Sequence, residues 1–209
     1  GPVSIVYRVT LVKANNTHAP VTFAIDPSGG TATVVADYAD FAGSTITVAD
    51  GAATGTLSVA VVNDALFENT ETVSATISAP SDPAVGITTA TAVANISDSD
   101  NAAGSINADL SVTTHGAETG PISIVYRVQI AKTNNTGASI TMQLSPSGGT
   151  AQAGADYTNF SGTVLTIADG TDSTTLTVNV FDDALFENTE TVQAALSNVS
   201  DPAITLNTP

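Results

Sequence analysis

The sequence contains no cysteine and no tryptophan, and only 4 of its 209 residues are lysine or arginine. The absence of cysteine excludes disulfide bonds, thiolate metal sites and cysteine nucleophiles. There are 20 acidic residues and the net charge is −16, which argues against nucleic acid or anionic membranes as partners, because phosphate groups need cations. No apolar run approaches the ~18–20 residues of a membrane span. No signal peptide is expected, since residue 1 leads directly into strand-like sequence.

Internal repetition is the strongest feature that the sequence does have. The decapeptide from Asp64 to Val73 recurs without change from Asp183 to Val192, an offset of 119 residues (183 − 64). The same offset aligns residues 1–90 with residues 120–209 without a gap, and roughly 50 of these 90 positions are identical. The chain therefore consists of two similar bodies joined by a connector over residues 91–119.

Both bodies have the pattern of β-strands. Apolar residues alternate with polar or small ones, which is the period of a half-buried strand. The clearest stretches in the first body are Ile5 to Leu11, Val21 to Ile25, Leu57 to Val61 and Val73 to Ile77. Turn-forming residues separate them, and helix-period stretches are missing. About seven short strands per body predict an all-β protein, built of two tandem immunoglobulin-like β-sandwiches in an extended array.

The connector holds two more strand candidates, Thr91–Ile96 and Ser105–Thr113. We expect the first to close domain one and the second to open domain two, which gives domains over residues 1–103 and 104–209. Domain one then lacks an opening strand, and domain two lacks a closing strand. Such edges expose unpaired backbone groups and apolar core. We therefore expect further copies of the repeat as partners, in the same chain or as head-to-tail neighbours, extending into a filament.

Acidic residues gather just after one predicted strand in each body. In the second body they are Asp182, Asp183, Glu187 and Glu190, and the aligned residues of the first body are Asn63, Asp64, Glu68 and Glu71. Two carboxylates ~4 Å apart repel by on the order of 4 kcal/mol at an effective dielectric constant of about 20. A bound cation would relieve this repulsion, and oxygen ligands without Cys or His select a hard cation such as Ca²⁺. The alternative is a solvated acidic loop.

The order of these residues resembles the Calx-beta domain, a family found in sodium/calcium exchangers, in integrin β4 and in large bacterial surface proteins. The matching segments are Gly149-Thr150-Ala151, Asp156-Tyr157, Asp182-Asp183, Glu187 with Glu190, and Ser97-Asp98-Ser99-Asp100. The resemblance extends over essentially the whole chain, twice.

Ca²⁺ is the cofactor that this resemblance implies. The implied ligands in domain two are Glu118, Asp156, Asp182, Asp183, Glu187 and Glu190. Those in domain one are Asp37, Asn63, Asp64, Glu68, Glu71, Asp98 and Asp100. Asn63 stands where the family has an aspartate, so the resemblance implies a weaker site in domain one.

The main functional hypothesis is a structural repeat of an extracellular, calcium-stiffened surface protein or filament, such as an adhesin stalk. Near-identical, gapless copies suit an array that extends length. The alternative hypothesis is a calcium-sensing regulatory module of the exchanger type. An enzyme is not expected, because no nucleophile–base pair, phosphate loop or histidine metal motif occurs. Paired carboxylates can hydrolyse glycosides, but few aromatic residues are present to line a sugar cleft.

Two asparagines are candidate sites for N-linked glycans. Asn15 and Asn134 both fit the acceptor pattern Asn-x-Ser/Thr, and they occupy the same predicted turn in the two copies. Other matches to this short pattern arise by chance in a chain rich in Asn, Ser and Thr.

Overall fold

The computed structural model describes residues 4–97, 102–184 and 186–207, and the regular elements in these ranges are β-strands. The predicted all-β class is confirmed. The described part of the chain contains no helix that is long and apolar enough to cross a membrane. The chain divides into two compact units. Unit 1 comprises Gly1–Asp64 and Thr70–Asp98, and unit 2 comprises Ala65–Asn69 and Ser99–Pro209.

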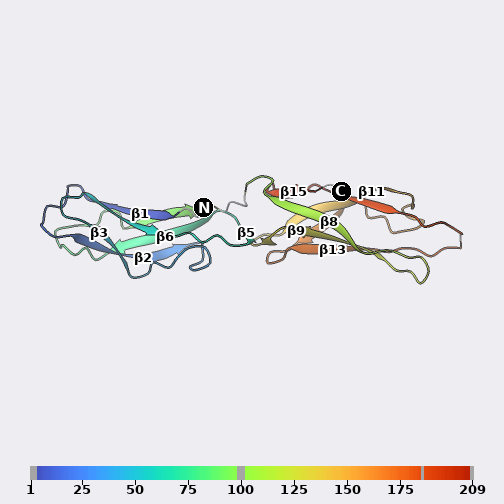
Figure 1. Cartoon of the computed structure of the whole chain (residues 1–209), viewed down its shortest axis with the longest axis horizontal. Coiled ribbons are helices and arrows are strands. Elements are labelled where there is room, and N and C mark those ends of the chain that lie inside the picture. Colours follow the sequence, from blue (N-terminus) through green and yellow to red (C-terminus); the bar gives the residue numbers. More distant parts are fainter. Residues whose placement is uncertain (1–3, 98–101, 185, 208–209) are drawn as a thin grey trace. The chain divides into compact units, whose positions relative to one another are not determined.

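Unit 1 is a sandwich of two antiparallel sheets (Figure 1). One sheet pairs β1 (Ile5–Thr10) with β4 (Thr54–Val59), and the other has the order β3 (Ser44–Val48), β2 (Val21–Gly30), β6 (Glu71–Ser78) and β7 (Thr91–Ile96). Along β1, Ile5, Tyr7 and Val9 are buried while the residues between them are exposed. The period-two pattern of the sequence thus places one face of the strand in the core.

Unit 2 has the same sandwich with additional pairing. One sheet has the order β13 (Ser173–Val178), β9 (Ile124–Ile130), β8 (Ile106–Thr114) and β15 (Ile204–Leu206), and another has β12 (Thr163–Ile167), β11 (Ile140–Gly149) and β14 (Val192–Ser197). A short parallel pair joins β5 (Leu66–Phe67) to β10 (Thr133–Asn134). The β5 strand comes from the first sequence copy, yet it belongs to unit 2.

One tyrosine in each unit ties the two sheets together. The Tyr7 hydroxyl on β1 donates a hydrogen bond to the Val73 carbonyl on β6 at 2.9 Å. The aligned Tyr126 hydroxyl donates to the Val192 carbonyl at 3.1 Å. Burial raises the pKa of both phenols, so they stay protonated and able to donate at neutral pH.

The two connector strands pair as the sequence predicted. The closing strand, β7, pairs antiparallel with β6, and the opening strand, β8, pairs antiparallel with β9. Within the described ranges, β1 pairs only with β4, and β14 pairs only with β11. The units differ from the predicted domains in two respects. The Ala65–Asn69 segment belongs to unit 2, and unit 2 resumes at Ser99, whereas the predicted boundary lies between residues 103 and 104.

A glycine in each unit allows a close approach between neighbouring strands. The register of β2 against β6 shifts between Pro27 and Gly29, and Gly30 follows with φ of +123°. A Cβ atom on Gly30 would lie 2.0 Å from the Thr72 carbonyl oxygen. The aligned Gly149 meets Thr191 at the same distance. Only glycine fits this backbone, which leads the chain into the loop that carries Asp37 or Asp156.

Candidate metal sites

The loop that carries Asp156 is fixed by the core residue next to it. Tyr157 is buried, its ring centroid lies 5.9 Å from that of Phe160, and its backbone forms an antiparallel bridge with Val180. The Phe181 amide then donates a 2.8 Å hydrogen bond to the Asp156 carbonyl. Asp156 therefore lies beside the start of the acidic stretch that follows β13.

Three predicted ligands of unit 2 come together. Asp156, Glu187 and Glu190 each place one carboxylate oxygen so that all three oxygens lie within 4.8 Å of one another. The Gln152 backbone amide donates to Asp156 Oδ2 and holds its orientation. Glu190 Oε2 is buried, and no donor among the described residues reaches it. A buried carboxylate oxygen without a partner is costly unless a cation or another ligand meets it.

The charges of this cluster act on one another. Burial, followed by the negative charges of Asp156, Asp183 and Glu118, raises the pKa of Glu187. Burial also raises the pKa of Glu190, followed by a hydrogen bond with Asp156 and then by nearby negative charges that include Glu118. Glu118 is thus an electrostatic neighbour of both glutamates, and Asp183 is one of Glu187. A cation placed among them would lower both raised pKa values.

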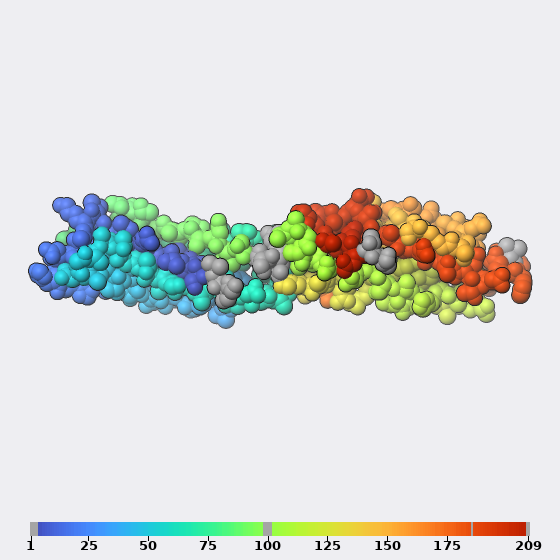
Figure 2. All heavy atoms as spheres, turned by 45° about the horizontal axis from the view of Figure 1, so that its top comes forward, coloured from blue at the N-terminus to red at the C-terminus, as the bar shows by residue number. Residues whose placement is uncertain are grey.

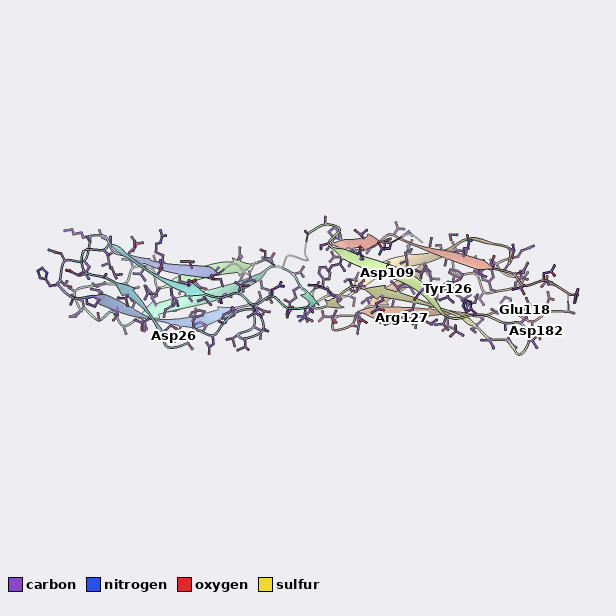
Figure 3. All side chains as sticks on the ribbon, in the orientation of Figure 1. Asp26, Asp109, Glu118, Tyr126, Arg127 and Asp182 are labelled. Carbon is purple, nitrogen blue, oxygen red and sulfur yellow. The ribbon has the colours of Figure 1, made fainter. Side chains whose placement is uncertain are left out.

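The elements around the cluster form an open cleft of about 850 Å³. Its lining includes the acidic residues Glu118, Asp156, Glu187 and Glu190, together with apolar side chains of β9 and β14. Glu118 is held in a turn by paired backbone hydrogen bonds between Ala117 and Ile122, at 3.0 and 2.7 Å. Glu118 and the exposed Asp182 lie at the same end of unit 2 (Figure 3). Figure 2 shows the orange-red part of the chain at the surface of this end of unit 2.

Unit 1 contains the aligned residues in a similar local setting. Asp37 is buried, its carbonyl accepts a 2.8 Å hydrogen bond from Val62 N, and the Thr33 amide donates to its Oδ2 atom. One carboxylate oxygen of Asp37 lies within 4.8 Å of one of Asp64. Asn63 is exposed beside Asp64. These positions match a cation site that has one carboxylate fewer than the unit 2 site, because Asn63 aligns with Asp182.

Two other predicted ligands of domain one, Glu71 and Glu68, belong to different units. Glu71 lies on β6 and is half-buried. Glu68 belongs to unit 2, where its Oε1 atom accepts a 2.6 Å hydrogen bond from Asn135 Nδ2. Asp98 and Asp100 lie outside the described residues. The residue pattern alone did not reveal the backbone amides of Thr33 and Gln152, which orient the two aspartates, because any residue type supplies such a donor.

The two candidate glycosylation sites lie in turns whose asparagine side chain is buried. Asn15 is 4% exposed and Asn134 is 0% exposed. The Asn15 amide donates to the Ala19 and Val48 carbonyls at 2.8 and 3.1 Å, and the Asn134 amide bonds in the same way. The threonine two residues later donates its hydroxyl to the asparagine Oδ1 atom in both copies. The Asn-x-Thr pattern therefore forms a turn in which the asparagine side chain is buried and its amide nitrogen is hydrogen-bonded in both copies.

Comparison with known protein families decides the assignment. The Calx-beta domain family matches residues 4–100 and 117–208. The chain belongs to the Calx-beta family. The tandem Calx-beta organisation predicted from the acidic residues is thereby confirmed.

Two crystal structures are among the solved structures that are similar to this Calx-beta chain. The crystal structure of CBD12 from CALX1.2 is 13% identical, with a TM-score of 0.42 over 94% of this chain and 73% of that chain. The crystal structure of the calcium binding domain CBD12 of CALX1.1 is 15% identical, with a TM-score of 0.41 over 94% of this chain and 74% of that chain. No curated protein matches the sequence.

Proposed function

We propose that this tandem Calx-beta chain is a calcium-binding module whose principal site is the Asp156, Glu187 and Glu190 cluster. The observation that carries the proposal is the buried, unpartnered Glu190 Oε2 atom, in a group whose carboxylate oxygens lie within 4.8 Å of one another. The family match supports a binding module over an enzyme.

The donor set favours calcium by its chemistry. The clustered groups supply only oxygen atoms, and Ca²⁺ takes about 6–8 oxygen ligands in a flexible geometry. Glu118, Asp182 and Asp183 are the acidic residues available to complete the shell, together with water. Zn²⁺ prefers nitrogen and sulfur ligands, and the chain contains no cysteine. Binding would replace carboxylate repulsion by attraction to the ion, so it would stiffen the loops that carry these residues.

Two roles of such a module remain distinct proposals. The family match favours a calcium-responsive regulatory module of the exchanger type. The long stretches of identical sequence in the two copies favour the second role, a calcium-stiffened spacer in an extracellular surface protein. The calcium affinity separates them, because sensors respond at roughly 10⁻⁷–10⁻⁵ M and extracellular modules at roughly 10⁻⁴–10⁻³ M. Isothermal titration calorimetry of the whole chain with Ca²⁺ measures this affinity.

Thermal melting of the whole chain tests calcium binding itself. Free Ca²⁺ at about 100 times Kd should stabilise the folded state by about 2.7 kcal/mol per site relative to chelator. Mg²⁺ at the same concentration should have a smaller effect, because it demands a tighter octahedral shell. Glu190→Gln should abolish most of the calcium-induced rise in the melting temperature of unit 2. The aligned Glu71→Gln in unit 1 is the matched control and should leave that rise of unit 2 in place. Equal melting temperatures in Ca²⁺ and in chelator would disprove the proposal.

A further inference from the structure

One sequence occupies two opposite environments in this chain. The decapeptides at 64–73 and 183–192 are identical. In the first copy Phe67 is 0% exposed and belongs to the hydrophobic core of unit 2. In the second copy the aligned Phe186 is 103% exposed. A single exposed phenylalanine is ordinary on a protein surface. Here, however, the first copy shows the kind of site in which a phenylalanine of this same decapeptide is buried.

In unit 2, a turn formed by Asn134, Asn135 and Thr136 holds three consecutive residues of the first copy. The Asn135 amide donates to the Phe67 carbonyl at 2.8 Å. The Asn135 side chain donates to Glu68 Oε1 at 2.6 Å, and the Asn69 side chain donates to the Thr136 carbonyl at 2.8 Å. The parallel pairing of β5 with β10 completes the contact. Burial of the Phe67 ring supplies most of the affinity of this contact, and the hydrogen bonds fix the register of the two segments.

The receiving turn also occurs twice. Its counterpart in unit 1 is Asn15-Asn16-Thr17, and it has the same internal hydrogen bonds. The Thr17 hydroxyl donates to Asn15 Oδ1 at 2.8 Å, as the Thr136 hydroxyl does to Asn134 Oδ1 at 2.8 Å. The central residue of the unit 1 turn, Asn16, is exposed. The turn is therefore formed in advance, and its outer face is accessible.

The hydrophobic core that contains Phe67 also contains residues with buried counterparts in unit 1. Ile167 and Ile140 have the counterparts Val48 and Val21, which are buried in unit 1.

We propose that Phe186, Glu187 and Asn188 form a docking segment that binds the Asn15-Asn16-Thr17 turn of a second copy of this chain. The contact would repeat the hydrogen bonds that Phe67, Glu68 and Asn69 make with residues 134–136. It joins two different surfaces, so it links copies head to tail and does not need to close into a ring. The proposal rests on the burial of Phe67 and on the hydrogen bonds at residues 134–136, not on calcium binding, although Glu187 belongs both to the docking segment and to the proposed calcium site.

Covalent trapping tests this contact in the whole chain. The sequence has no cysteine, so introduced pairs react cleanly with a short bis-maleimide. The Asn188→Cys, Thr17→Cys variant places thiols at the proposed contact, and its expected product is a ladder of covalent dimers and larger oligomers. The Asn69→Cys, Thr136→Cys variant is the matched positive control, because these residues already contact each other. The Asn188→Cys, Thr56→Cys variant is the control for unspecific reaction, since Thr56 is exposed on β4.

The expected result has three parts. The positive control should cross-link within one chain, the proposed pair should give the ladder, and the Thr56 pair should not. Adding Phe186→Ala to the proposed pair should lower the oligomer yield by about tenfold or more, because the buried ring supplies the affinity. If the positive control reacts while the proposed pair stays monomeric, the proposal is wrong. It is equally wrong if Phe186→Ala leaves the ladder unchanged or if the Thr56 pair gives the same ladder.

Discussion

At the scale of single residues, two glutamates of unit 2 couple the fold to protons and to calcium. Burial and neighbouring carboxylates raise the pKa of Glu187 and of Glu190. A raised pKa means that the folded state favours the protonated acids. Without calcium, their contribution to stability is fully present below the ordinary glutamate pKa. It is lost as the pH rises through the raised values of the folded state.

The first prediction is therefore a calcium effect that depends on pH. Calcium needs the ionised carboxylates, so protons compete with it for Glu187 and Glu190. The difference in melting temperature between Ca²⁺ and chelator should be small near pH 4, where the ordinary glutamate titrates. It should widen as the pH rises toward neutrality. The Glu187→Gln, Glu190→Gln double variant should show a smaller and flatter difference. A large calcium shift in the wild type that stays constant across this range would argue against these two ligands.

The second prediction concerns Asn63, which stands where unit 2 has Asp182. Asn63→Asp adds a carboxylate beside Asp64, so it should raise the calcium affinity of the unit 1 site by about tenfold. The reverse change, Asp182→Asn, is the matched control and should weaken the unit 2 site. Isothermal titration of each whole-chain variant would measure the change. Equal affinities in Asn63→Asp and wild type would remove Asn63 from the proposed ligand set.

At the scale of strands, local patterns predicted the sandwich well, whereas contacts that depend on context were not predictable. The connector strands are found as β7 (Thr91–Ile96) and β8 (Ile106–Thr114), because alternation and turn residues are properties of the local sequence. The β5 strand was missed. Its sequence is identical to the second copy, so no local signal can tell the buried Phe67 from the exposed Phe186. The same holds for the candidate site. The acidic residues could be identified from the sequence, but their grouping around Asp156 could be seen only in the folded structure.

The third prediction concerns the strand contact at Gly30. Gly30→Ala would place a Cβ atom 2.0 Å from the Thr72 carbonyl oxygen, at a φ of +123°. The β2–β6 pairing would have to open, so we expect a loss of about 2 kcal/mol or more in the free energy of unfolding. Gly86→Ala is the matched control in the same unit, because a Cβ there meets nothing within 4 Å. Urea denaturation followed by circular dichroism would compare them, and similar midpoints would contradict this account of the bulge.

At the scale of the whole chain, the two units differ in how completely their sheets are paired. The β6 strand of unit 1 pairs with both β2 and β7. Its counterpart β14 pairs only with β11 within the described ranges. The open side of β14 adjoins the cleft that is lined by the acidic cluster and by Tyr126 and Val192. A strand at this edge would satisfy backbone groups and cover apolar surface in unit 2.

An extension of the chain can supply a strand at this edge of β14, and its effect is the last prediction. Residues 198–209 align with residues 79–90, which connect β6 to β7 in unit 1. A second copy of residues 91–97, appended after Pro209, therefore has the spacing needed to pair antiparallel with β14, as β7 does with β6. The extended chain should melt at a higher temperature. Those amide protons of residues 192–195 that do not already point toward β11 should exchange more slowly, because the added strand accepts their hydrogen bonds. An extension of the same length with proline at alternate positions is the control, since proline cannot donate to the ladder. Equal exchange rates in the two extended chains would show that β14 does not accept a strand, and the filament hypothesis would lose its structural basis at this edge.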